Sequence, residues 1–167
     1  MPGTTAAGSS LARAGKPPYR RTMNDIEKLE IERACERLVT AYCHYVDHGE
    51  AARIAELFTE DGVWAGPGTR MAGRAELAAG FGKRQAQKER MSRHVCNNFL
   101  CEVEDADHAS GVVYLTLYRH DGDVDRKVSP LEGPELVGEY RDRFVRTAEG
   151  WRIEDRRINV TFMRGAA

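Results

Sequence analysis

The sequence has no long apolar run and no excess of charge of either sign. No stretch approaches the roughly 18–20 apolar residues that a helix needs to span a bilayer. The 25 Lys and Arg residues nearly balance the 26 Asp and Glu residues, which leaves a formal net charge of -1 at pH 7. Because the arginines are also scattered along the chain, no global field favours nucleic acid or an anionic membrane, and we expect neither as a partner.

The cysteines are few and follow no motif. The four residues Cys35, Cys43, Cys96 and Cys101 form no CxxC spacing and lie in apolar patterns. In a chain of this size they are most simply interpreted as buried free thiols in a reducing compartment. We therefore expect a soluble cytoplasmic protein.

The first residues carry no periodic apolar pattern. Residues 1–22 are mostly Gly, Ser, Thr, Ala and Pro with a few basic residues. Because they lack the apolar segment of a secretory signal, the sequence predicts a disordered tail or a docking arm, with a transit peptide as the alternative. The remaining length fits a single domain, which we place at residues 23–164.

Helices are predicted first along the chain. Asn24 or Asp25 can cap a helix that runs to Asp47, with an apolar stripe at three- and four-residue steps. Asp47 ends this helix beside its main apolar stripe. A short helix is expected at 50–58, a short strand at 63–64 and a third helix at 74–90.

The apolar period then changes from three or four to two. Strands are predicted at 92–104, 109–120, 134–148 and 151–162. In the last of them Trp151 and Ile153 share one parity whereas Ile158 shares the other, which predicts a β-bulge near 155–157 and a strongly curved sheet. Helices followed by hairpin-connected strands indicate an α+β fold, with a cone-shaped, curved antiparallel or mixed sheet wrapped around the N-terminal helices. The mouth of such a cone is where a small ligand would bind.

Several dispersed motifs occur in a familiar order. They are Tyr42-x4-Asp47-x3-Ala51, Leu57-Phe58-x2-Asp61-Gly62, Gly73-Arg74, Arg93-His94-x3-Asn98, Gly138-x-Tyr140-x-Asp142-x-Phe144 and Gly150-Trp151-Arg152-Ile153. Over residues 25–163 this order resembles the SnoaL-like branch of the nuclear transport factor 2-like superfamily, which includes scytalone dehydratase, hexachlorocyclohexane dehydrochlorinase and bile-acid 7α-dehydratase. The resemblance implies a cystatin-like α+β barrel, no cofactor, and a homodimer or homotrimer.

The resemblance also implies a catalytic pair. The family's aspartate falls on Asp47 and its histidine on His94, while the tyrosine of the bile-acid enzyme matches Tyr42. The strand arginine of the dehydrochlorinase falls on or beside Arg146. Two departures concern the substrate: Leu117 lies near the position of a middle-strand aspartate of the bile-acid enzyme, and the second histidine of scytalone dehydratase has no counterpart.

The residue types fit proton transfer. Imidazole is the side chain best suited to taking a proton near pH 7, and a carboxylate on its other nitrogen fixes the tautomer. No serine or cysteine nucleophile is placed by the pattern, so we expect abstraction of a C–H or O–H proton. The candidate substrate-binding residues are Tyr42, Tyr45, Trp64, Asn98, Tyr140, Asp142 and Arg146.

Structural interpretations remain open for these residues. Asp47 can be a solvated helix end, His94 a core histidine, and Asp142 a cross-strand partner of Arg156. His44 and His48 flank Asp47 without a specified third ligand, and we expect no metal.

The sequence therefore predicts a cofactor-independent, dehydratase-like lyase acting on a small hydrophobic or polycyclic oxygenated molecule. The alternatives are an isomerase or polyketide cyclase with the same pair, and a non-catalytic ligand-binding protein or a subunit like the β subunit of ring-hydroxylating dioxygenases.

Overall fold

The computed structural model describes residues 22–122 and 128–166. The predicted N-terminal tail lies outside the described residues, apart from Thr22. The described elements are α1 (Asp25–Asp47), the 3-10 helix η1 (Ala51–Leu57), β1 (Phe58–Gly66), β2 (Thr69–Ala72), α2 (Arg74–Ala86), β3 (Arg90–Val103), β4 (His108–Asp121), β5 (Leu136–Thr147) and β6 (Gly150–Met163). None of the helices in these ranges is long and apolar enough to cross a membrane.

The first helix begins at a capping box. The Asn24 side chain accepts a hydrogen bond from the Glu27 backbone, and the Glu27 carboxylate accepts one from the Asn24 backbone, both at 2.9 Å. These two bonds satisfy orphan donors of the first turn, which typically stabilises a helix by about 1 kcal/mol. The helix ends before Gly49, whose φ of 80° lies in the left-handed region that favours glycine.

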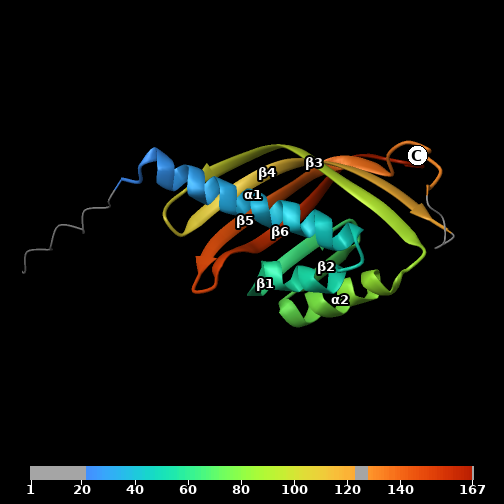
Figure 1. Ribbon diagram of the computed structural model, residues 1–167, viewed down its shortest axis with the longest axis horizontal. Helices are drawn as coiled ribbons and strands as arrows, with labels where there is room; N and C mark the ends of the chain where they lie inside the picture. The colour runs from blue at the N-terminus through green and yellow to red at the C-terminus, as the bar shows by residue number, and fades with distance from the viewer. Residues whose placement is uncertain (1–21, 123–127, 167) are drawn as a thin grey trace, which may run out of the picture.

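Six strands form one mixed sheet in the order β2-β1-β6-β5-β4-β3. Only β1 and β6 pair in parallel among the described strands, and all other neighbours are antiparallel. Figure 1 shows the sheet curving around α1, with η1 and α2 beside β1 and β2 at one end. The predicted α+β architecture with a curved mixed sheet around the N-terminal helices is confirmed.

Bulges in β6 and β3 set which side chains face inward. In β6 the residue paired with β5 advances from Ile153 to Asp155, so Glu154 is the extra residue. Inward parity accordingly changes from Trp151 and Ile153 to Arg156, as the sequence predicted to within a residue or two. In β3 the register shifts between Asn97 and Leu100.

The core lies between α1 and the concave face of the sheet. Its helix side differs from the predicted stripe, because Val39, Cys43 and Val46 are buried whereas Ala34 and Ala41 are only half-buried. The helix is thus rotated toward its second apolar edge, which carries Asp47 inward. The buried apolar side chains from the rest of the chain are Ala51, Ile54, Ala55, Phe58, Leu77, Phe81, Ala109, Val113, Leu115, Tyr140, Phe144, Trp151 and Ile153.

The sequence was least accurate before β3. The predicted strand at 63–64 is longer and begins at Phe58, β2 was not predicted, and the third helix ends at Ala86 rather than 90. Residues 59–62, which the sequence did not assign to a strand, lie inside β1, where the pairing with β6 is irregular between Phe58 and Val63. Gly62 lies in that irregular stretch, and an added Cβ there would meet the Phe58 Cβ at 2.9 Å.

Candidate active site

Asp47 and His94 meet at the concave face of the sheet. The Nδ1 atom of His94 lies 2.7 Å from Asp47 Oδ1, and the His94 backbone N–H donates to Asp47 Oδ2 at 2.7 Å. The two side chains are only 11% and 5% exposed. The end of α1 and the start of β3 thus hold one histidine through both its ring and its backbone.

Two further groups fix the Asp47 carboxylate. The Ser92 hydroxyl donates to Asp47 Oδ1 at 2.7 Å, and Arg84 of α2 donates to Ser92 Oγ at 3.1 Å. Burial alone would raise the pKa of Asp47, but the hydrogen bonds from His94 and Ser92 hold that pKa below its ordinary value. The carboxylate is therefore ionised at neutral pH, and since it can only accept, the proton of the imidazole lies on Nδ1.

Ser92 and Arg84 were not predicted. Ser92 precedes His94 by two residues and so shares its face of β3, which is a signal that the sequence contained. Arg84 is at the end of α2, and no sequence pattern indicated that this end contacts β3.

Aromatic rings surround the pair. The ring of Tyr42 lies edge-to-face with His94 and with Tyr140, at centroid distances of 6.4 and 5.6 Å. Trp64 Nε1 donates to the Tyr42 hydroxyl at 3.0 Å, and Phe81 contacts both of these rings. The structure therefore brings three of the predicted binding residues, Tyr42, Trp64 and Tyr140, together beside the pair.

Both tyrosines are held as neutral phenols. Burial raises the pKa of Tyr42 to about 12, although Arg156 and the hydrogen bond from Trp64 act in the opposite direction. Burial likewise raises the pKa of Tyr140 well above its ordinary value. Each can donate a proton in a hydrogen bond at neutral pH but is not a base.

Asp142 lies beneath these rings in a buried ion pair. Its carboxylate accepts from Arg156 Nε at 2.8 Å and from Arg156 NH2 at 2.6 Å, with side chains 1% and 0% exposed. The cross-strand interpretation of Asp142 holds, since the two residues are direct partners across β5 and β6.

Arg156 is the basic residue that the sequence interpretation did not place at the site. Its Cζ atom lies 4.4 Å from the centroid of the Tyr42 ring and 4.3 Å from that of Tyr140. Its NH1 group is buried and has no hydrogen-bond partner among the described residues. Burial alone would lower the pKa of Arg156, but Asp142 raises it above the ordinary value, so the guanidinium stays charged. The signal in the sequence was its position in the Asp155-Arg156-Arg157 run at the predicted bulge.

Arg146 does not belong to this site, contrary to the prediction. Its side chain is 51% exposed and lies 3.9 Å from Asp107, with Cζ 5.4 Å from the Trp151 ring centroid. Arg146 lies two residues after Phe144, the last buried residue of β5, and close to the turn that joins β5 to β6. This end of the strand extends beyond the buried core.

Asn98 and Tyr45 are also directed elsewhere. Asn98 was a candidate for substrate binding, but the β3 bulge gives Asn98 a φ of 53° and an exposed position. The Tyr45 hydroxyl accepts from Arg53 at 2.9 Å, and the Arg53 guanidinium stacks on its ring, so Tyr45 connects α1 to η1.

Within residues 22–122 and 128–166, no three His, Cys, Asp or Glu side chains are grouped so that they could hold a metal ion. The rings of His44 and His48 stack 5.3 Å apart, and His48 Nδ1 lies 2.9 Å from the His44 carbonyl oxygen.

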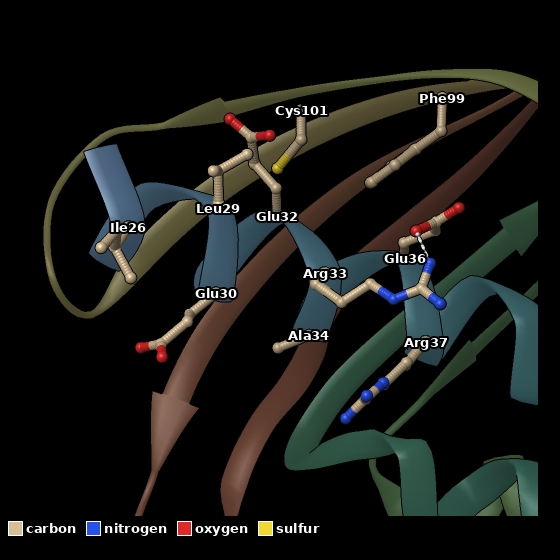
Figure 2. Close-up of a pocket in the computed structure, with 10 residues that line it drawn as sticks. All are labelled: Ile26, Leu29, Glu30, Glu32, Arg33, Ala34, Glu36, Arg37, Phe99 and Cys101. Carbon is tan, nitrogen blue, oxygen red and sulfur yellow. Dashed lines mark hydrogen bonds and ion pairs between the residues drawn. The ribbon is translucent and has the colours of Figure 1, made fainter.

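Two surface grooves differ in their relation to the pair. A groove of about 800 Å³ runs along the N-terminal half of α1, where Figure 2 shows Phe99 and Cys101 above the helix. It includes neither Asp47 nor His94. A groove of about 290 Å³ between β3, β4 and residues 128–133 includes Ser92, so it adjoins the pair.

Comparison with known proteins identifies the family. The model of the SnoaL-like domain family matches residues 27–157, and the chain therefore belongs to the SnoaL-like family. A search among curated proteins finds no significant match.

Solved structures share the fold. A nuclear transport factor 2-like protein with a cystatin-like fold from Novosphingobium aromaticivorans is 28% identical, with a TM-score of 0.69 and coverage of 85% of this chain and 88% of that one. A scytalone dehydratase-like protein of the same organism is 20% identical, with a TM-score of 0.71 and coverage of 85% of this chain and 91% of that one. A type 2 hexachlorocyclohexane dehydrochlorinase (LinA) is 16% identical, with a TM-score of 0.70 and coverage of 86% of this chain and 94% of that one.

Proposed function

We propose that this protein is a cofactor-independent lyase of the dehydratase type, acting on a small hydrophobic or polycyclic oxygenated molecule. The observation that carries the proposal is the hydrogen bond between His94 Nδ1 and the buried Asp47 carboxylate. Membership of the SnoaL-like family and the fold shared with a scytalone dehydratase-like protein and a dehydrochlorinase support an elimination reaction.

His94 acts as the general base. With its proton on Nδ1, the lone pair on Nε2 takes a proton from a substrate carbon next to a carbonyl group. The imidazolium that forms is stabilised by Asp47, which stays ionised throughout. A positioned base of this kind contributes about 10²–10⁴ in rate.

Tyr42 acts as the proton donor. Its oxygen already accepts from Trp64, so its own O–H is available to a leaving hydroxide or a substrate carbonyl. When water leaves, His94 holds the proton taken from carbon and Tyr42 lacks the one it gave. Proton transfer through solvent from His94 to Tyr42 restores both residues.

Arg156 stabilises negative charge that develops on the substrate. Its unpaired NH1 group and its position over the Tyr42 and Tyr140 rings support this role. A fixed cation in a water-poor site lowers the energy of an enolate oxygen or a leaving anion more than it would in water. The same first step serves an isomerase or a polyketide cyclase, and the product distinguishes these reactions.

The test is deuterium incorporation from D₂O into a panel of hydroxylated polycyclic ketones, with product analysis for loss of water. We expect His94→Ala and Asp47→Asn each to lower exchange by about 10²–10⁴. The matched control is His108→Ala, which removes a histidine from an exposed histidine–aspartate pair and leaves exchange unchanged. Exchange near the wild-type rate in both site variants would refute the assignment.

We also propose that the chain forms a homodimer or homotrimer through the outward face of β3 and β4. Val95, Leu100 and Tyr114 are 45%, 72% and 53% exposed on these two strands, and such a patch favours association. Light scattering on the purified chain tests this, with Tyr114→Glu expected to lower the mass. A wild-type monomer would contradict it, and a monomer that co-purifies with a large iron-containing subunit would favour the β-subunit alternative.

A further inference from the structure

Helix α1 and strand β3 run side by side with a repeating set of contacts. Asp47 meets His94, and one turn earlier Cys43 meets Cys96 with a sulfur–sulfur distance of 3.5 Å. The spacing explains this, because four helical residues and two strand residues each advance about 6–7 Å. The Cys43–Cys96 contact, which we name the inner thiol pair, therefore follows the histidine–aspartate contact in register.

A second thiol contact continues the series. Cys35 lies two turns before Cys43, and the neighbouring Cys101 thiol raises the pKa of Cys35. Figure 2 shows the Cys101 sulfur directed from β3 toward α1, at the groove along that helix. We name Cys35 and Cys101 the outer thiol pair. All four cysteines thus connect the same two elements.

The two thiols of the inner pair differ in their surroundings. The hydrogen bond from Cys43 and the nearby Arg156 lower the pKa of Cys96 despite its burial, whereas the pKa of Cys43 is raised. Cys96 is also the more accessible of the two, being half-buried while Cys43 is 8% exposed. The thiolate is the nucleophile, so Cys96 is the residue that an oxidant meets first.

We propose that Cys43 and Cys96 are a site of reversible oxidation, at which a peroxide converts the inner thiol pair into a disulfide between α1 and β3. The Cys96 thiolate attacks one peroxide oxygen, which breaks the O–O bond, releases hydroxide and leaves a sulfenic acid. The Cys43 thiol then attacks that sulfur and water leaves. Hydrogen peroxide is reduced to two waters as two thiols become one disulfide, and a dithiol reverses the change.

The sulfur atoms are already close together. A disulfide requires them to move from 3.5 Å apart to about 2.05 Å. The link would fix the helix one turn before Asp47, and would join residues 53 positions apart in sequence. Closing so long a loop restricts the unfolded chain, and we expect a rise in Tm of roughly 5–10 °C. The proposal does not depend on the reaction proposed above.

The test is peptide mapping after brief treatment of the folded protein with hydrogen peroxide, followed by alkylation of the remaining thiols. Trypsin places Cys35 in peptide 34–37 and Cys43 in peptide 38–53, while Cys96 and Cys101 share peptide 94–119. The Cys101→Ala variant therefore makes the assignment unique. We expect a cross-link between peptides 38–53 and 94–119 in this variant, with the rise in Tm, both reversed by dithiothreitol.

Two variants serve as matched controls. Cys35→Ala removes a buried cysteine of the outer thiol pair and should keep the link, whereas Cys43→Ala should lose it and leave Cys96 as a sulfenic acid that dimedone traps. In the wild-type chain, conversion of Cys96 to sulfinic acid while Cys43 still alkylates would overturn the proposal. A cross-link that joins only peptides 34–37 and 94–119 would overturn it as well.

Discussion

Two histidine–aspartate pairs among the described residues have nearly the same bond and different surroundings. His94 and Asp47 are joined at 2.7 Å across two elements, with side chains 11% and 5% exposed. His108 and Asp105 are joined at 2.9 Å within one turn between β3 and β4, with side chains 47% and 28% exposed.

The difference shows what the fold adds to the residues. The Asp105 carboxylate accepts the backbone N–H groups of Asp107 and His108, so its pair follows from local turn geometry. Asp47 instead depends on a helix end, a strand and the end of a second helix. Only this pair lies beside aromatic rings and a buried cation, where water is scarce and charge interactions are strong.

The largest expected effect extends the comparison to two arginine pairs of β5 and β6. Asp142→Asn leaves the buried Arg156 charge uncompensated, which should cost about 3–5 kcal/mol in the free energy of unfolding. The matched control is Glu154→Gln, which breaks an exposed pair with Arg143 at 3.3 Å on the same strands and should cost about 1 kcal/mol or less. Urea denaturation measures both. Equal costs would contradict the assigned role of burial.

A smaller loss is expected from Asp47→Asn. The amide nitrogen would face the donors of His94 and Ser92, so charge-assisted hydrogen bonds worth about 1.5–3 kcal/mol are lost. Asp105→Asn, at the exposed pair, should change the free energy of unfolding much less because water replaces the lost contacts. Urea denaturation measures both variants. An equal loss in the free energy of unfolding at the two sites would contradict the expectation that the buried pair stabilises the fold more than the exposed pair.

The pH dependence of stability should separate Asp47→Asn from the wild type. The pKa of Asp47 is lowered in the folded state, so its contribution is complete above about pH 4 and is lost as the pH falls through the lower folded value. Denaturation at pH 7, 4 and 2.5 should give a smaller acid loss in Asp47→Asn than in the wild type. Parallel curves for the two proteins would show that Asp47 is not ionised in a stabilising contact.

The smallest expected effect concerns the β3 bulge. Asn98 has a φ of 53°, which asparagine tolerates better than alanine, so Asn98→Ala should cost about 1 kcal/mol. Asn97→Ala, on the neighbouring residue with ordinary φ, is the control and should be nearly neutral. Thermal unfolding measures both variants. A neutral Asn98→Ala would show that the backbone at this position does not favour asparagine over alanine.

The apolar periods of the sequence predicted most of the helices and strands, although not β2. Periodicity and capping identified α1 and the last four strands, and the candidate residues Asp47, His94, Tyr42, Trp64 and Tyr140 form one connected set of contacts. The prediction for Asn98 was wrong because the alternation of inward and outward residues changes at a bulge. One extra residue in β3 leaves Asn98 exposed.

Register across the sheet was the second limit. A single strand does not reveal which residue lies opposite it, so the sequence could not choose Arg156 rather than Arg146 as the basic residue of the site. That choice depends on the pairing of β5 with β6, in which Asp142 lies directly across from Arg156.

The proposed reaction requires that Asp47 hold the proton of His94 on Nδ1 and leave Nε2 free to act as a base. Nitrogen-15 NMR of the imidazole at neutral pH tests this directly. We expect a protonated, exchange-protected Nδ1 and an unprotonated Nε2 in the wild type, with protection lost in Asp47→Asn. A proton on Nε2, or a ring that exchanges as rapidly as that of His108, would contradict it.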